Sequence, residues 1–412
     1  MVTKPLHKRI YHYTVKNVLN IITLRKLRKI ASLKIRMLVY KQKIKELEKD
    51  FPDNTVLIFQ QSFFNMLGTQ CYNGGAERYV VDLADILTQF GYKPVLVQLG
   101  DKESGTWKQS AGKLDVIGLS VDLKEYASVI QLFTKFRFVI YSGAVIDWGK
   151  KLLHPNILIS HGITWDAYSE DGCPQKILDV FKEVDKFVSV DTNTISWLRS
   201  TFPKTLKNLD ANYIPNYVDT EKYYPVKHNN KDKEIYITFP RRANMERGYW
   251  LMSEALPSIF EKYDNVFVKF VGFAHGDDVQ QDMLHLEQKY PGHVTHCMVN
   301  ADEMPEIYQN TDISVIPTVC AEGTSLSCLE AQACGNVVIA TNIGGLPNLI
   351  LNGYNGILIN PNVQELINAL DMVLSDEDLR KNLSKNAVAV SYSFDKKVWQ
   401  KRWSGIIEQY RR

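Results

Sequence analysis

The most informative segment of the 412-residue chain reads Ala321-Glu322-Gly323-Thr324-Ser325-Leu326-Ser327-Cys328-Leu329-Glu330-Ala331. It follows an apolar run that predicts a strand ending at Pro317, and it opens a helix that we expect to stop at Gly335. Glycine permits close backbone approach, and Thr324 or Ser325 can cap the helix. A helix N-terminus attracts anions through its free N–H groups. The turn around Gly323, Thr324, Ser325 and Leu326 is therefore a candidate diphosphate site.

Short β-branched runs on both sides of this segment predict two series of alternating strands and helices. The first series has expected strands at Val56–Phe59, Val95–Leu99, Phe138–Tyr141, Ile157–Ser160 and Phe187–Val190. The second has expected strands at Ile235–Phe239, Val266–Val271, Ile313–Ile316, Val337–Ala340 and Ile357–Ile359. Spacing of this kind is typical of parallel, doubly wound α/β sheets. We take the polar stretch His228 to Lys233 as the linker between two such domains.

Four segments follow from this pattern. Residues 1–50 form a basic helical extension, residues 51–225 an N-terminal Rossmann-like domain, and residues 226–390 a C-terminal Rossmann-like domain. Residues 391–412 form a last helix that we expect to pack back toward the N-terminal domain. A length of 412 residues suits two domains, and a ligand cleft between them is the natural expectation.

The charge of the chain is unevenly distributed. The net charge is +3, but residues 1–50 hold 14 Lys or Arg against 3 Asp or Glu, so the remainder is mildly acidic. This argues against nucleic acid as a partner, because binding it requires a basic face on the folded body. A basic segment with apolar residues at helical spacing can lie on an anionic membrane surface. The alternative is a helical extension that packs on the body or pairs with another chain.

Localisation is predicted from what the sequence lacks. No run approaches the roughly 20 apolar residues that span a bilayer, and the N-terminus has no secretory pattern. The six cysteines show no metal-type or redox-type spacing, so we interpret them as reduced thiols. We therefore expect a cytoplasmic protein, either free or peripheral on the inner face of the cell membrane.

A second cluster, Arg241-Arg242-Ala243-Asn244-Met245-Glu246-Arg247-Gly248, directly follows the expected strand Ile235–Phe239. The carboxyl end of a parallel strand is where such sheets bind ligands. Two guanidinium groups five residues apart can clamp both phosphates of a diphosphate. We assign this role to Arg242 and Arg247, and we interpret Arg241 as a surface neighbour.

These features together resemble the family-4 (group 1) retaining glycosyltransferases, which have the GT-B fold. The family signature has two glutamates separated by seven residues, followed by alanine and a later glycine. Glu322, Glu330, Ala331, Ala333 and Gly335 match it. Arg242 and Gly248 match a second pattern, in which Arg247 stands where lysine is usual. The resemblance implies that Glu322 contacts the transferred sugar and that Glu330 contacts the ribose hydroxyls.

Further residues match the family outside these two clusters. Gly74 and Gly75 resemble the glycine loop that approaches the donor from across the cleft, and His161 follows a strand at a place where the family has a sugar-contacting histidine. Asp166 either holds that loop or touches the acceptor. Gly344-Gly345 either shapes the sugar pocket or forms a tight turn. The segment Asn212 to Pro225 resembles the interdomain connection, with Tyr217 in place of a usual glycine.

The resemblance implies transfer of a sugar, with retention, from a nucleotide diphosphate sugar to a hydroxyl acceptor. We expect a glycan or a lipid-linked acceptor in bacterial surface polysaccharide or glycolipid synthesis. We expect no metal or other cofactor, because Arg242, Arg247 and the helix N-terminus supply positive charge to the leaving diphosphate. The acidic stretches Asp376-Glu377-Asp378 and Asp277-Asp278 are interpreted as helix starts. The alternatives are a non-catalytic sugar-binding subunit and another enzyme on the same fold, such as an epimerase or a phosphorylase.

Overall fold

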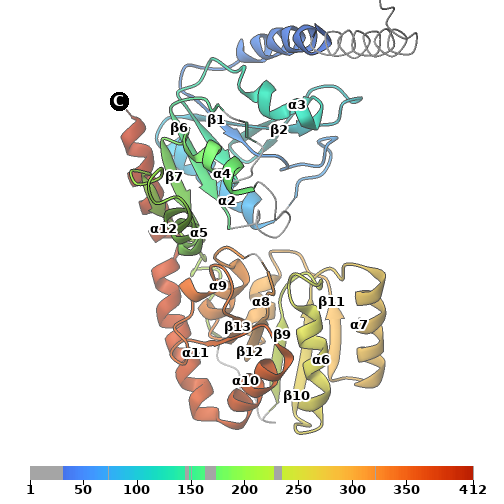
Figure 1. The fold of residues 1–412 in the computed structure, drawn as a ribbon. Coiled ribbons are helices and arrows are strands. Elements are labelled where there is room, and N and C mark those ends of the chain that lie inside the picture. Colours follow the sequence, from blue (N-terminus) through green and yellow to red (C-terminus); the bar gives the residue numbers. More distant parts are fainter. Residues whose placement is uncertain are drawn as a thin grey trace, which may run out of the picture.

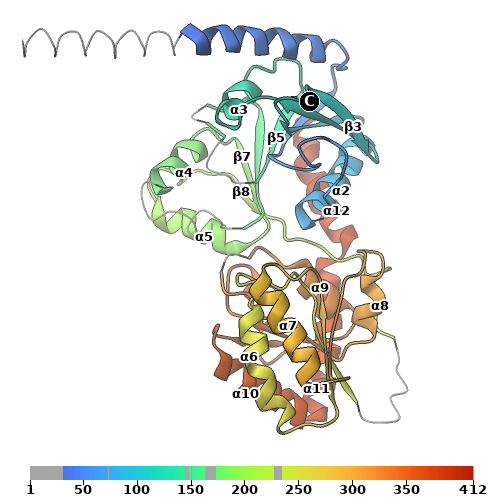
Figure 2. The same ribbon diagram turned by 90° about the vertical axis from the view of Figure 1, so that its right-hand side faces the viewer.

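A computed structural model of the chain describes residues 31–72, 74–143, 148–149, 151–162, 173–226, 234–320 and 322–411. Two α/β domains are stacked end to end (Figure 1), and a helix over residues 31–48 crosses the end of the N-terminal domain that points away from the C-terminal domain (Figure 2). The expected linker and the apolar stripe in residues 1–30 lie outside the described residues, as does Asp166.

The N-terminal domain is built on a sheet with the strand order β3-β4-β2-β1-β5-β6-β7-β8. Its strands are β1 (Thr55–Phe59), β2 (Lys93–Gly100), β3 (Trp107–Ala111), β4 (Leu114–Ser120), β5 (Phe138–Ser142), β6 (Asn156–Ser160), β7 (Lys186–Ser189) and β8 (Ala211–Tyr213). Helix α2 (Gly75–Gln89) covers one face, and α3 (Leu123–Ile130), α4 (Cys173–Phe181) and α5 (Thr192–Thr201) pack on the other. Adjacent strands are parallel, except that β3 and β4 are antiparallel.

The C-terminal domain has a parallel sheet with the strand order β11-β10-β9-β12-β13-β14. Its strands are β9 (Ile235–Phe239), β10 (Val266–Val271), β11 (Val294–Cys297), β12 (Ile313–Ile316), β13 (Val337–Thr341) and β14 (Ile357–Ile359). One face packs against α6 (Tyr249–Phe260), α7 (Asp277–Lys289) and α10 (Val363–Ser375), and the other against α8 (Met304–Gln309) and α9 (Leu326–Ala333). The predicted class, two Rossmann-like α/β domains, is confirmed.

The strand order places the site. In the N-terminal sheet β1 lies between β2 and β5, and in the C-terminal sheet β9 lies between β10 and β12. Successive strands are therefore added on opposite sides of β1 and of β9, which makes each of them a topological switch point. Parallel sheets bind ligands at the carboxyl ends of the strands at such points. Gln60 follows β1, and Arg241 lies two residues beyond β9.

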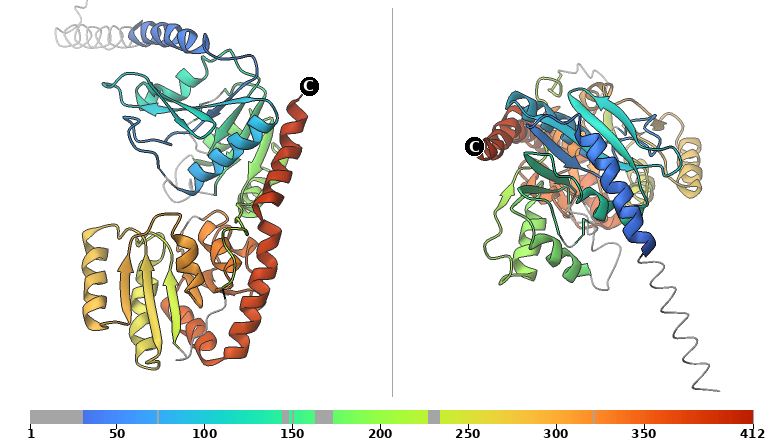
Figure 3. Two further views of the ribbon diagram at one scale, coloured as in Figure 1. Left: turned by 180° about the vertical axis from the view of Figure 1, so that it is seen from behind. Right: turned by 90° about the horizontal axis from the view of Figure 1, so that it is seen from above.

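The last helices join the two domains. Helix α11 (Glu377–Ser391) belongs to the C-terminal domain, and α12 (Lys396–Ile407) runs alongside the N-terminal domain (Figure 3, left). Trp399 and Trp403 on α12 enter the core between the N-terminal sheet and α2. The Trp403 indole N–H donates to the Tyr79 hydroxyl at 2.7 Å, and both side chains are buried. This end of the chain thus supplies core residues to the first domain.

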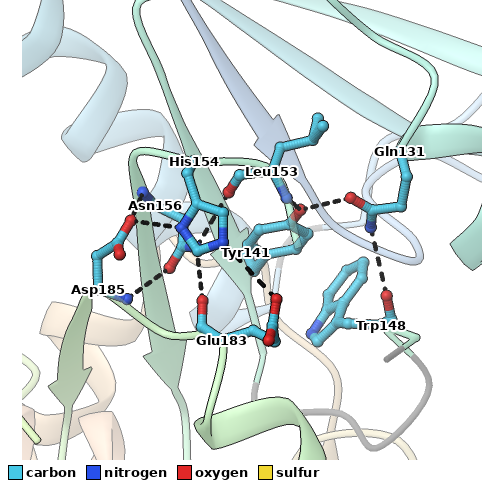
Figure 4. Close-up of polar contacts among 8 residues, drawn as sticks. All are labelled: Gln131, Tyr141, Trp148, Leu153, His154, Asn156, Glu183 and Asp185. Atoms are coloured by element: carbon cyan, nitrogen blue, oxygen red, sulfur yellow. Dashed lines mark hydrogen bonds and ion pairs between the residues drawn. The ribbon is translucent and has the colours of Figure 1, made fainter. Parts of the chain in front are cut away.

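A polar cluster fixes the end of the N-terminal sheet where β6 begins (Figure 4). The amide of buried Asn156 donates to the Leu153 and Glu183 carbonyls, and the Asp185 carboxylate accepts from the Asn156 backbone N–H at 2.8 Å. The His154 ring lies 2.9 Å from the same carboxylate. Because His161 follows the opposite end of β6, this cluster aligns the strand without entering the cleft.

One face of the helix over residues 31–48 packs on the body, as one of the two alternatives for the extension predicts. Ile44 is buried in the N-terminal core, and the Glu48 carboxylate accepts from the backbone N–H of Thr134 and Lys135 after α3. Another face is open to solvent, where Ile35 and Leu38 are 62% and 68% exposed. No helix among the described residues is long and apolar enough to cross a membrane.

The expected strands all form. Several are longer by one to three residues, and the strand expected at Phe187–Val190 is shifted by one residue to Lys186–Ser189. Sequence reasoning missed the hairpin of β3 and β4, because β3 is a largely exposed edge strand whose apolar pattern is weak. Gly118 explains how the hairpin closes, since a Cβ there would lie 2.0 Å from the Trp107 ring. The short edge strands β8 and β11 were also missed.

Replacing Trp403 tests the contribution of α12 to the first domain. We expect Trp403→Ala to lower the free energy of unfolding by about 3–5 kcal/mol, because a large buried ring leaves a cavity. The matched control, Lys401→Ala on the exposed face of the same helix, should change it by less than about 0.5 kcal/mol. Urea unfolding monitors both variants, and equal effects would contradict the assignment.

Candidate active site

The centre of the site is the Glu322 carboxylate at the C-terminal side of the cleft. Its Oε2 accepts hydrogen bonds from Arg241 Nη2 at 2.7 Å, Arg247 Nη1 at 2.6 Å and Thr318 Oγ1 at 3.0 Å. The Glu322 side chain is only 11% exposed. Burial raises the pKa of Glu322, but the charges of Arg241 and then Arg247 outweigh it and hold the pKa below its ordinary value. Glu322 is therefore an ionised acceptor and not a proton donor.

The structure corrects the interpretation of Arg241 as a surface neighbour. The Arg241 side chain is 8% exposed and bonds both Thr318 and Glu322, whereas Arg242 is exposed. Arg242 instead acts electrostatically on Glu77 of α2, in the other domain. Of these two adjacent arginines, Arg241 is thus buried within the C-terminal domain and Arg242 is exposed.

Glycines allow the backbone to close around Glu322. A Cβ at Gly344 would lie 2.1 Å from the Glu322 carbonyl oxygen, and one at Gly345 would lie 2.6 Å from the Gly323 carbonyl carbon. Gly344 also has φ +56°, in the left-handed region. From the N-terminal domain, Gly162 brings the chain after His161 against Gly323, where a Cβ would lie 2.9 Å from the backbone nitrogen. Gly344 and Gly345 therefore pack directly against the backbone of Glu322 and Gly323, and the expectation that they shape a sugar pocket stays a prediction.

The start of α9 differs in detail from expectation. Ser325 occupies the N-cap position, but its side chain makes no capping hydrogen bond. The Thr324 hydroxyl donates to the Val190 carbonyl at 2.9 Å and accepts from the Asn216 N–H at 2.8 Å. The prediction that one of these hydroxyls caps the helix is wrong, because Thr324 ties the two domains together instead. The N–H groups that open α9 are left for another acceptor.

Glu330 lies in a cavity between the domains. The cavity has a volume of about 320 Å³, and its lining includes Gly75 and Arg78 of α2 together with Tyr223, Leu326 and Glu330. Both Nη atoms of Arg78 reach Glu330 Oε1, at 3.1 and 3.2 Å. Sequence reasoning missed Arg78, although a cation three residues after the glycine loop was a usable signal.

The glycine loop meets α9 directly. Gly74 precedes α2 and Gly75 is its first residue, and a Cβ at Gly75 would lie 2.9 Å from Leu326 Cδ1. The structure therefore brings Gly75 and Leu326 together across the cleft, as their shared assignment to the donor site predicts. A larger residue at position 75 would separate the two helix starts.

A chain of hydrogen bonds within the N-terminal domain links the His161 ring to Glu77. Its Nε2 lies 3.2 Å from the Ser142 hydroxyl, which donates to Gln60 Oε1 at 3.0 Å, and the Gln60 amide lies 3.3 Å from Glu77 Oε1. Burial lowers the pKa of His161 to about 4, so the ring is neutral at pH 7. Because Ser142 donates to Gln60, it accepts from Nε2–H, and Nδ1 is the nitrogen without a proton. Gln60 and Ser142 were missed, although each is a polar residue at a strand end.

The acidic stretches act as helix starts. Asp376 is the N-cap of α11 and accepts from the Leu379 N–H at 2.8 Å. Asp277 and Asp278 lie in the first turn of α7. No group of three or more His, Cys, Asp or Glu side chains within the described ranges is arranged to hold a metal ion.

Comparison with known proteins agrees with this geometry. The model of the family described as glycosyl transferases group 1 matches residues 221–390, the C-terminal domain that carries Glu322, Glu330 and the arginines. The C-terminal domain is that of the group 1 glycosyltransferases. The resemblance stated from sequence is confirmed.

Relatives and solved structures extend the match beyond the C-terminal domain. The chain is 28% identical over 239 residues to the N,N'-diacetylbacillosaminyl-diphospho-undecaprenol alpha-1,3-N-acetylgalactosaminyltransferase of Campylobacter jejuni, which covers 56% of this chain and 61% of that relative. It thus spans less than two thirds of that protein. Sucrose-phosphate synthase from Thermosynechococcus elongatus has a TM-score of 0.69 and 16% identity, covering 86% of this chain and 98% of its own.

The structure of HepE from Anabaena in complex with UDP-glucose has a TM-score of 0.67 at 17% identity, covering 86% of this chain and 99% of its own. At such low identities these two structures show the fold alone. The GT-B arrangement expected from the sequence is confirmed.

Replacing Gly344 tests whether the Glu322 loop depends on backbone contact. Gly344 and Gly353 both have φ in the left-handed region, at +56° and +76°, but only Gly344 has atoms in the way of a Cβ. We expect Gly353→Ala to cost about 1–2 kcal/mol of unfolding free energy. Gly344→Ala should cost about 1–3 kcal/mol more, because the Glu322 backbone must move. Urea unfolding of both variants measures the difference, and equal costs would show that the contact is unimportant.

Proposed function

We propose that the chain is a retaining glycosyltransferase that moves a sugar from a nucleotide diphosphate sugar to a hydroxyl acceptor. The observation that carries the proposal is the ionised Glu322 carboxylate, held by two arginines beside uncapped N–H groups of α9. Such a site has a hydrogen-bond acceptor for a sugar and positive potential for a diphosphate. The match of residues 221–390 to the group 1 glycosyltransferases supports the same reaction.

Each group has a role in the proposed reaction. Arg242, Arg247 and the N–H groups at Gly323 to Leu326 stabilise the negative charge that develops on the diphosphate as its bond to the sugar C1 breaks. The acceptor oxygen forms its bond to C1 from the same face, and its proton passes to the leaving phosphate oxygen. Glu322 and the unprotonated His161 Nδ1 accept hydrogen bonds from sugar hydroxyls, and Glu330 takes the ribose after exchanging its bond with Arg78.

The acceptor is proposed to be a glycan or a lipid-linked saccharide of a bacterial surface polysaccharide or glycolipid. The printed name of the Campylobacter relative describes a sugar transferred to a diphospho-undecaprenol carrier, which supports a lipid-linked acceptor here. The non-catalytic subunit is less favoured, because a binding protein does not need a buried carboxylate neutralised by two cations.

A screen of nucleotide sugars tests this proposal. At about 100 times its Kd, the right donor should stabilise the fold by about 2.7 kcal/mol and raise the melting temperature. In the presence of acceptor it should release nucleotide diphosphate. Glu322→Gln and Arg242→Ala should each lower kcat/KM by about 100-fold or more, since each removes a group that acts on the transition state.

Three comparisons complete the experiment. EDTA should leave transfer unchanged, because arginines and helix N–H groups supply the positive charge. Nuclear magnetic resonance of the first product should show the anomeric configuration of the donor. Binding of a donor without any transfer or hydrolysis would favour the non-catalytic subunit, and no binding to any nucleotide sugar would refute the proposal.

We also propose that the N-terminal segment holds the enzyme on the cytoplasmic face of an anionic membrane. The helix over residues 31–48 places exposed Ile35, Leu38 and Val39 beside exposed Lys34 and Lys41, on the end of the molecule that points away from the C-terminal domain (Figure 2). Apolar side chains that enter the headgroup region and cations that meet lipid phosphates favour such binding together. The basic residues before position 31 add to the same charge.

Co-sedimentation with vesicles tests the membrane proposal. We expect Ile35→Ser with Leu38→Ser to weaken binding to anionic vesicles about 10-fold or more, since each change removes about 1 kcal/mol or more of apolar burial. The control, Leu284→Ser, removes a leucine that is 57% exposed on α7 of the other domain, and it should have no effect. Equal binding of the double variant, or a loss of self-association in its place, would contradict the proposal.

A further inference from the structure

Arg241 has a different environment from the arginines that the family pattern identifies. It lies two residues after β9, its side chain is 8% exposed, and both of its Nη atoms are engaged. Gly272 after β10 makes this position possible, because a Cβ there would lie 2.8 Å from the Arg241 carbonyl group. The adjacent Arg242 is exposed. Arg241 is therefore held within the C-terminal domain, whereas Arg242 remains available to a ligand.

All of the donors around Glu322 reach the same oxygen. Arg241, Arg247 and Thr318 bond Oε2, and no donor from the described part of the chain reaches Oε1. Arg241 also donates to the Thr318 hydroxyl at 2.5 Å, so these two side chains brace each other. One carboxylate oxygen is thus used for attachment, and the other is left for a substrate hydroxyl.

The two arginines that bond Glu322 differ in whether they can move away from it. Arg247 is 26% exposed and has a single bond to Glu322, so it can turn to a phosphate while Arg241 still neutralises the carboxylate. If Arg241 moved away as well, the buried Glu322 carboxylate would have no cation beside it, which is strongly unfavourable. Two cations and one anion also leave the cluster with one positive charge in excess, which suits an incoming diphosphate.

A stability role alone does not account well for Arg241. Buried ion pairs contribute little net stability, because desolvation offsets their attraction. The Arg241 Nε is also buried and has no hydrogen-bond partner among the described residues, which is a cost. An arrangement that is unfavourable for folding but keeps a carboxylate fixed is characteristic of a functional site.

We propose that Arg241 is a positioning residue: it anchors Glu322 through Oε2, so that Oε1 faces the transferred sugar and Arg247 is released to the donor phosphates. This inference rests on the proposed function and deepens it. It predicts that the two neighbouring arginines differ in their effects: loss of Arg241 acts mainly on turnover, whereas loss of Arg242 also strongly weakens diphosphate binding.

Substitution of the two arginines by methionine tests the proposal. We expect Arg241→Met to lower kcat about 100-fold, because a displaced carboxylate no longer meets the reacting sugar. The affinity for inorganic pyrophosphate should fall by only about 3-fold, because Arg247 then stays paired with Glu322 while Arg242 still binds the phosphates. Arg242→Met, the matched control, should weaken pyrophosphate binding about 10-fold or more through loss of a charge-assisted contact. Arg241→Lys should recover part of kcat, since it restores the cation.

The pH profile of kcat distinguishes positioning from general stability. The groups that face the Glu322 carboxylate are Arg241 after β9, Thr318 after β12, Arg247 before α6 and the Cys328 thiol of α9. Loss of the Arg241 charge raises the pKa of Glu322, so the acidic limb of the profile should move to higher pH in Arg241→Met. The Arg242→Met profile should keep the wild-type position.

A milder variant covers the case in which Arg241→Met does not fold. Thr318→Val keeps the side-chain shape and removes one brace, so kcat should fall about 5- to 10-fold with unchanged pyrophosphate affinity. If the wild type transfers sugar but kcat and the pH profile of these variants equal those of the wild type, the positioning role is refuted and the proposed function stands. If the wild type binds no nucleotide sugar, both proposals fail.

Discussion

A carboxylate removed from water must be neutralised, and this constraint organises the cleft. Glu322 is nearly buried, so its charge requires cations close by. Arg241 and Arg247 supply them from the turn after β9, and Thr318 supplies a hydroxyl from the end of β12. These strands are neighbours in the sheet, so the topology of the domain brings the partners of Glu322 together. The order of strands in the sheet therefore also provides the cations that the buried Glu322 carboxylate requires.

Contact between the domains is specific on both sides of this cluster. Thr324 and Asn216 join the start of α9 to the interdomain segment, and Thr324 also bonds Val190 of the N-terminal domain. Arg78 reaches across to Glu330 in the cavity. A ligand that binds Glu330 must therefore compete with the Arg78 guanidinium.

The larger features of the fold could be predicted from the sequence because they depend on local pattern. β-Branched apolar runs identify buried parallel strands, and the glycine and glutamate spacing of residues 322–335 identifies a helix start at a strand end. The hairpin of β3 and β4 could not be found in this way, since an exposed edge strand lacks the apolar run on which the prediction depends.

The orientation of individual side chains was less predictable. Arg241 and Arg242 are chemically identical neighbours, and only the packing of Gly272 and the loop of Thr318 decides which one is buried. Thr324 or Ser325 was expected to cap α9, but the Thr324 hydroxyl accepts a hydrogen bond from the Asn216 backbone N–H instead. In both cases contacts between segments distant in sequence decide where the side chain lies. A local sequence pattern holds no information about such contacts.

The return of α12 to the first domain has a consequence for biosynthesis. The core between the N-terminal sheet and α2 contains Trp399 and Trp403, which the ribosome adds after the whole second domain. Domains commonly fold in order as they emerge. Here the earlier domain stays incomplete, with apolar surface around Tyr79 uncovered, until the later one has been translated. Synthesis of α12, and not emergence of the first half of the chain, thus sets the moment at which this core closes.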